Sequence, residues 1–175
     1  MLVIGIDAAS RQFGLACLEI GSREPKLISA KLVKLDIDDD FISRLAEVYR
    51  EVLGYLTSLK PDVVAVEDVK FSPYTKNIGM ITKTAYAVGT AMAAVGEYKR
   101  FEPHVRTMTL NAHEVRSALG ISRSAGKEGT RRLINTRFHD DLIACGLASG
   151  VKKTGQDVSD AIALAWVTAA KINAS

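Results

Sequence analysis

The sequence has few residues of the kinds that build zinc sites, disulfides or membrane spans. It contains two cysteines and three histidines in 175 residues, and Cys17 and Cys145 lack the spacing of a metal site or a disulfide. We expect both cysteines to be reduced packing residues. No apolar run approaches the roughly 20 residues of a membrane helix, and the N-terminus has no signal-peptide pattern. These absences predict a protein that acts inside a cell, without membrane contact.

A strong excess of charge of either sign is also missing. The chain carries 23 Lys and Arg against 20 Asp and Glu, which gives a net charge of +3 and a pI near 8.9. This balance gives mild support for a polyanionic partner. The length suits one domain with a sizeable core, spanning residues 1–175, and is too short for two.

The apolar patterning predicts a mixed α/β fold. We expect strands at 2–7, 12–20, 26–35, 62–69 and 104–108, and helices at 40–59, 79–98, 111–118, 128–143 and 157–170. The first three strands can pair as a meander, and helix-strand-helix units follow them. This order indicates one mixed five-stranded sheet with helices on both faces.

Acidic residues stand at the ends of two predicted strands and at the start of the last helix. Asp7 ends the apolar run in "VIGIDAASRQFG", and Glu67 ends the run in "DVVAVEDV". Asp157 and Asp160 lie at i and i+3, which places them on one helix face. An aspartate such as Asp7 can cap a turn, face a phosphate as in kinase-type ATPases, or hold a metal. Asp157 can also serve as a helix N-cap.

The four acids together favour a metal site. Unpaired carboxylates that meet beside an apolar core repel one another, and a divalent cation removes that cost. Oxygen-only ligands favour Mg²⁺ or Mn²⁺, and the absence of a His/Cys cluster argues against zinc. Paired ions of this kind support in-line displacement at phosphorus, so the implied reaction is phosphodiester hydrolysis.

Basic residues cluster on and after a glycine-bearing loop. They are Arg116, Arg123, Lys127, Arg131, Arg132 and Arg137. Such a stripe would neutralise phosphates and make nucleic-acid binding salt-sensitive. For Arg131, Arg132 and Arg137 a solvated helix face is the alternative interpretation.

The chain resembles the RuvC family of Holliday junction resolvases, in the ribonuclease H-like and retroviral integrase superfamily. The segments that carry the resemblance are "IGIDAASRQFG", "DVVAVEDV", "NIGMITKTAYAVGTAMAAV" and "DVSDAIALAW", and "HEVRSALGISRSAGKEGTRRLI" is similar to the family's basic segment. The resemblance covers nearly the whole chain. It implies a ribonuclease H-like sheet, cytoplasmic location in a bacterium or a phage-infected cell, and paired cleavage of Holliday junctions in DNA recombination and repair.

The resemblance also implies residue roles. It assigns metal binding and catalysis to Asp7, Glu67, Asp157 and Asp160, with two Mg²⁺ ions per site for which Mn²⁺ substitutes. Arg116 and Lys127 stand where the family contacts DNA near the scissile phosphate. Phe71 is the first choice for an aromatic that stacks on opened bases, and Tyr74 the second. Packing of Phe71 under its loop is the alternative.

This sequence departs from the family at two places. Ala8 and Ala9 replace the usual Pro-Gly, and the loop "DVKFSPYTKN" is longer than expected. A broader nuclease for flaps, forks and three-way junctions therefore stays open. A non-catalytic DNA-binding module and an actin-like kinase or ATPase fragment are less favoured, because the first needs no acids and the second needs a further glycine-rich phosphate motif.

A homodimer is expected from the symmetry of the substrate. A four-way junction has approximate two-fold symmetry and is cut in two opposed strands, whereas four acids build one site per chain. The helix at 79–98 is the candidate interface, because Met80, Ile81, Met92 and Val95 exceed what one core face needs. Burial of this helix within the monomer is the alternative.

Overall fold

The fold is built on a mixed five-stranded sheet. The computed structural model describes residues 1–21, 24–69, 77–147 and 155–174. The strands in the described ranges are β1 (Leu2–Asp7), β2 (Gln12–Glu19), β3 (Lys26–Lys34), β4 (Val63–Asp68) and β5 (Arg106–Asn111). Their order across the sheet is β3-β2-β1-β4-β5. The pairs β1–β2 and β2–β3 are antiparallel, and the pairs β1–β4 and β4–β5 are parallel. The predicted meander and mixed sheet are confirmed.

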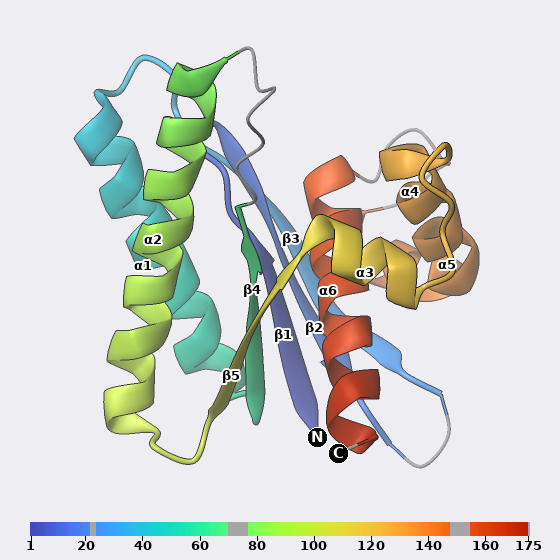
Figure 1. Ribbon diagram of the computed structural model, residues 1–175. Helices are drawn as coiled ribbons and strands as arrows, with labels where there is room; N and C mark the ends of the chain where they lie inside the picture. The colour runs from blue at the N-terminus through green and yellow to red at the C-terminus, as the bar shows by residue number, and fades with distance from the viewer. Residues whose placement is uncertain (22–23, 70–76, 148–154, 175) are drawn as a thin grey trace.

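Helices cover both faces of this sheet, as predicted. The helices are α1 (Phe41–Leu59), α2 (Ile78–Phe101), α3 (Ala112–Ala118), α4 (Gly126–Arg137), α5 (His139–Ala144) and α6 (Gln156–Asn173). Figure 1 shows α1 and α2 on one face and α3 to α6 on the other. Each face has its own apolar core: Val3 packs on the α6 side, whereas Ile4 and Ile6 pack on the α1 and α2 side. This division follows the two-residue period of a strand.

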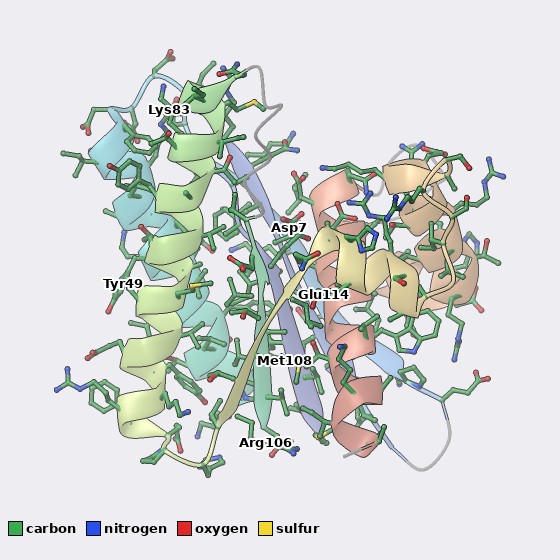
Figure 2. The ribbon with its side chains drawn as sticks, in the orientation of Figure 1. Asp7, Tyr49, Lys83, Arg106, Met108 and Glu114 are labelled. Carbon is green, nitrogen blue, oxygen red and sulfur yellow. The ribbon has the colours of Figure 1, made fainter. Side chains whose placement is uncertain are left out.

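Two strand glycines allow α6 to lie directly against the sheet. A Cβ atom on Gly5 would come within 2.1 Å of the Ala161 carbonyl oxygen, and one on Gly14 within 2.0 Å of the Asp157 carbonyl oxygen. Any side chain at either position would therefore push α6 away. The close approach brings the first turn of α6 to the end of β1. In Figure 2, Asp7 lies at that end of the sheet and Arg106 at the opposite end.

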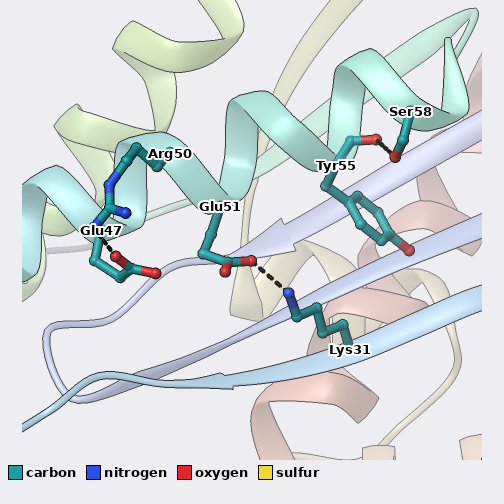
Figure 3. Close-up of polar contacts among 6 residues, drawn as sticks. All are labelled: Lys31, Glu47, Arg50, Glu51, Tyr55 and Ser58. Carbon is teal, nitrogen blue, oxygen red and sulfur yellow. Dashed lines mark hydrogen bonds and ion pairs between the residues drawn. The ribbon is translucent and has the colours of Figure 1, made fainter.

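Polar contacts fasten α1 to the outer strand β3. Lys31 Nζ lies 2.5 Å from Glu51 Oε2 (Figure 3). The Tyr55 hydroxyl donates to the Ser29 carbonyl at 3.1 Å. Nearer the end of β1, Arg44 Nη1 donates to the Ser10 carbonyl at 3.2 Å. These contacts hold α1 across β3 and secure the turn that follows Asp7.

The predicted single helix at 128–143 is wrong. The chain leaves helical geometry at Phe138, which has φ −115° and ψ 28°, so α4 ends at Arg137 and α5 begins at His139. The Phe138 ring is buried and packs edge-on against Trp166, with ring centroids 5.5 Å apart. After this break, Asp141 Oδ2 accepts a hydrogen bond from the Leu27 backbone amide at 3.0 Å. Burial of one aromatic ring and a long-range contact therefore interrupt an otherwise helical pattern. The predicted strand at 104–108 lies at Arg106–Asn111 instead.

Helix α2 has a buried side and, near its N-terminal end, exposed apolar side chains. Its length and apolar composition would fit a membrane span, but α2 packs its Ala and Val residues against α1 and the sheet. Val95 is only 5% exposed, so its predicted place on an outward face is wrong. Met80, by contrast, is 60% exposed. Only 28% of the most apolar stretch of α2 is buried.

Candidate active site

The ends of β1 and β4 bring two of the predicted acids together. Asp7 ends β1, Glu67 is the penultimate residue of β4, and Ile6 pairs with Val66 across these parallel strands. Neighbouring parallel strands expose their carboxyl ends at the same edge, where sites of open α/β sheets form. A cleft of about 340 Å³ lies there. Its lining includes Asp7, Glu67, Asp68, Asn111, His113 and Arg116.

Burial and mutual repulsion raise the pKa values of three of the four acids. Burial raises the pKa of Asp7 well above its ordinary value, and the charges of Glu67, Asp160 and Asp157 raise it further. Burial is also the first cause that raises the pKa of Glu67 to about 7, followed by the charge of Asp160. The pKa of Asp160 is raised by burial as well. The four acids therefore interact across one site.

The first turn of α6 does not use Asp157 as its cap, so that alternative is wrong. The N-cap residue is Gly155, which makes no side-chain cap. Asp157 Oδ2 instead accepts from Gln12 Nε2 at 2.7 Å, and Asp160 Oδ1 accepts from Gln156 Nε2 at 3.0 Å. Sequence reasoning missed both glutamines. The first lies within the "VIGIDAASRQFG" stretch, but no local pattern connects it to a helix 145 residues away.

The chemistry of the acids fits a hard divalent cation. All four side chains offer oxygen, which suits Mg²⁺ or Mn²⁺ and not zinc. The raised pKa values of Asp7 and Glu67 report the charge repulsion that a cation would relieve. Across the described ranges, no three His, Cys, Asp or Glu side chains already close around a single ion position. The donors fit the ion by type, and their oxygens would converge on binding.

Three of the predicted basic residues stand beside this cleft. Arg116 lines it and lowers the pKa values of Glu67 and Asp160, in part offsetting the effect of burial. Lys127 Nζ lies 4.0 Å from Asp160 Oδ2. Arg123 Nη2 lies 3.4 Å from His113 Nε2 at a second cavity, of about 260 Å³, that shares His113 and Arg116 with the cleft. These side chains form a basic border on one side of the acids.

Two of the other predicted basic residues, Arg131 and Arg137, do not line the cleft. Arg131 pairs with Glu128 at 2.6 Å, and Arg137 pairs with Glu24 at 2.6 Å and lies over the Phe138 ring. Both carry more acidic compensation than the sequence suggested. Phe71 and Tyr74 lie outside the described residues.

Comparison with solved structures places the fold in the ribonuclease H-like class of nucleases. The structure of Thermus thermophilus RuvC superposes with a TM-score of 0.71 at 26% identity, covering 99% of this chain and 97% of that one. T. thermophilus RuvC in complex with a Holliday junction substrate superposes with the same TM-score at 23% identity, covering 100% and 97%. The fowlpox virus Holliday junction resolvase, at 14% identity and a TM-score of 0.55, shares the fold.

Sequence comparison identifies the family. The model of the crossover junction endodeoxyribonuclease RuvC matches residues 3–168. RuvC of Mycobacterium ulcerans is 31% identical over 166 residues, which cover 94% of this chain and 81% of the relative. RuvC of Brachyspira hyodysenteriae is 23% identical over 175 residues, covering 98% and 95%. The chain belongs to the RuvC family of crossover junction endodeoxyribonucleases, which resolve Holliday junctions and are generally metal-dependent. The resemblance drawn from the sequence and the nuclease function it implied are confirmed.

Proposed function

We propose that this chain, as one nuclease domain over 1–175, cuts four-way DNA junctions at the cleft beside Asp7. In this proposal Asp7, Glu67, Asp157 and Asp160 hold two Mg²⁺ ions, for which Mn²⁺ substitutes. The observation that carries it is the meeting of four acids whose burial and mutual repulsion raise the pKa values of Asp7, Glu67 and Asp160. When bound, the metal ions supply an activated water and stabilise the leaving 3′ oxygen.

The chain's own residues would position the DNA for this reaction. The acids come from rigid elements, because Asp7 and Glu67 end paired strands and the other two begin a helix that packs on the sheet. Arg116, Arg123 and Lys127 border the acids and would hold phosphates of the bound strand. Attack in line with the departing 3′ oxygen would leave 5′-phosphate and 3′-hydroxyl ends.

The proposal extends to residues outside the cleft and its basic border. We place Phe71, or else Tyr74, against opened bases at the junction centre, as the family resemblance implies. Arg131 is a weaker candidate for DNA contact, because Glu128 already compensates its charge. The bacterial sources of the RuvC relatives support a cytoplasmic location.

A cleavage panel tests this function. Labelled four-way junction, Y-junction, flap and linear duplex are incubated with Mg²⁺, Mn²⁺ or EDTA. We expect paired cuts in the four-way junction with either metal and none in EDTA. Cutting in EDTA would overturn the metal mechanism, while equal cutting of flaps and four-way junctions would make the chain a broader branched-DNA nuclease. Cutting of linear duplex at the same rate would remove structure selectivity.

Exposed apolar residues in the N-terminal half of α2 support a homodimer. Ile78, Met80 and Tyr86 are 76%, 60% and 58% exposed in the single chain, which is unusual for large apolar side chains on one helix. A second copy that covers these residues would produce a two-fold dimer with two separated sites, matching the junction's symmetry.

Analytical ultracentrifugation at micromolar protein tests the interface. Met80→Glu should produce monomers and reduce paired cutting, because it places a charge among the residues that the second copy would cover. Lys99→Glu, farther along the same helix, is the control for an added negative charge and should leave the dimer intact. A wild-type monomer that makes full paired cuts would overturn the proposed homodimer. A dimer that tolerates Met80→Glu would show that the interface lies elsewhere.

A further inference from the structure

The chain has two glutamines, and each donates a hydrogen bond to one of the two acids that begin α6. Gln12 Nε2 donates to Asp157 Oδ2 at 2.7 Å, and Gln156 Nε2 donates to Asp160 Oδ1 at 3.0 Å. Neither glutamine belongs to the acid set or to the basic border. Both bonds are partly buried, so water competes with them less than at an exposed surface.

The two bonds reach the acids from different elements. Gln12 is the first residue of β2, and Gly14 two residues later permits the close approach of α6 that brings Asp157 within reach. Gln156 lies one turn before Asp160 on α6 itself. One acid is therefore held across the sheet-helix contact, and the other within its own helix.

Each amide engages one oxygen of its carboxylate. Asp160 shows this arrangement directly, since Oδ1 accepts from Gln156 while Oδ2 faces Lys127 at 4.0 Å. An amide donor is neutral, so it fixes a carboxylate without cancelling the negative charge that attracts a cation. A lysine or arginine at the same place would fix the carboxylate and repel the ion.

We infer that Gln12 and Gln156 are positioning residues that limit the rotation of Asp157 and Asp160, so that fewer carboxylate orientations compete with the ones that bind the divalent cations. This inference rests on the proposed metal site. Partners of metal-binding side chains typically change metal affinity or activity by about 10- to 100-fold when they are removed. Loss of either amide should therefore weaken metal binding even when no DNA is present.

Binding of Mn²⁺ to the DNA-free protein tests the inference without relying on turnover. The electron paramagnetic resonance signal of free Mn²⁺ is followed during titration. Gln12→Met and Gln156→Met keep the side-chain length and remove the donor, and each should raise the Mn²⁺ dissociation constant about 10-fold. Ser58→Ala, which removes a hydrogen bond on α1 far from the acids, is the control and should leave it unchanged.

A combined variant separates positioning from a general loss of structure. If Gln12 acts through Asp157, then adding Gln12→Met to Asp157→Asn should change Mn²⁺ affinity much less than adding it to the wild type. Equal effects in both backgrounds would overturn the inference, as would unchanged or tighter Mn²⁺ binding by folded Gln12→Met and Gln156→Met. Thermal melts in EDTA establish folding, and Gln156→Met alone decides if Gln12→Met fails to fold. A wild type that binds no Mn²⁺ overturns the proposed metal site and this inference with it.

Discussion

Helices α1 and α6 both begin with aspartates, but the two sets of carboxylates lie in opposite environments. At α1, Asp40 is the N-cap, and its Oδ1 accepts the backbone amides of Ile42 and Ser43 at 2.8 and 3.0 Å. Hydrogen bonds from Ser43 lower the pKa of Asp40. At α6, the cap is Gly155, and burial raises the pKa of Asp160. Asp40 thus accepts hydrogen bonds from the backbone amides of its own helix, whereas Asp157 and Asp160 accept them from glutamine side chains.

The difference shows that residue type and helix position do not determine what an acid does. Asp40 is exposed and faces donors, so its charged form is favoured. The acids at α6 face Asp7 and Glu67, so their charges accumulate where the sheet ends. The predictions below exploit this contrast, in order of decreasing effect.

The largest expected effect is the loss of junction cleavage when an acid of β1 or α6 is replaced. Replacing the N-cap acid of α1 should have no such effect. Asp7→Asn or Asp157→Asn should reduce junction cleavage in Mg²⁺ by roughly 1000-fold or more, because each removes a charged metal ligand while keeping its shape. Junction binding, measured by gel shift, should persist. Asp40→Asn should cleave like the wild type, since asparagine also caps helices. Full cleavage by Asp7→Asn would remove this site from the mechanism.

The next effect concerns the contact that brings α6 to the acids. Gly14→Ala should lower the free energy of unfolding by ~3 kcal/mol, because its Cβ would meet the Asp157 backbone. Gly54→Ala, in α1 with nothing within 4 Å, should instead raise it by ~0.5–1 kcal/mol. Guanidinium denaturation of both variants measures the difference. Equal effects at the two positions would mean that α6 does not depend on Gly14.

The metal-free protein should lose stability as pH rises through the range in which Glu67 ionises. The folded pKa of Glu67 is about 7, above its ordinary value of 4.5, so the folded state holds this proton more tightly than the unfolded state does. This contribution is greatest below pH 4.5 and is lost as the pH rises to about 7.

Glu67→Gln isolates that contribution. In EDTA, the free energy of unfolding of the variant should rise relative to that of the wild type between pH 4.5 and 7, by roughly 1–3 kcal/mol at the upper end. Denaturant midpoints at several pH values measure the gain, and saturating Mg²⁺ should abolish it by relieving the repulsion. A pH-independent difference between the two proteins would contradict the account.

The smallest effect concerns the basic border. Arg116→Ala and Lys127→Ala should each reduce the slope of log binding constant against log salt by about one unit, if each contacts one phosphate. Arg100→Ala, which removes a surface charge paired with Glu97 on α2, is the control and should leave the slope unchanged. Unchanged slopes for Arg116→Ala and Lys127→Ala would make them ordinary surface charges.

Much of this arrangement follows from local sequence. Period-two and helical apolar patterns indicated the strands and most of the helices, because burial on one or two faces is repeated along each element. Acids directly after buried strands, such as Asp7 and Glu67, pointed to the cleft because parallel strands end at one edge. The break at Phe138 was missed, since it depends on a ring packed against Trp166 on another helix.

The sequence by itself determined most of the elements, the four acids and the family, since these depend on residues near one another in the chain or in a fixed order along it. The tertiary structure alone decided that Asp157 accepts a hydrogen bond from Gln12. Gln12 meets Asp157 across 145 residues only because Gly14 lets α6 lie against β2. Such a contact depends on close packing between distant segments, so it cannot be predicted from the local periodicity of the sequence.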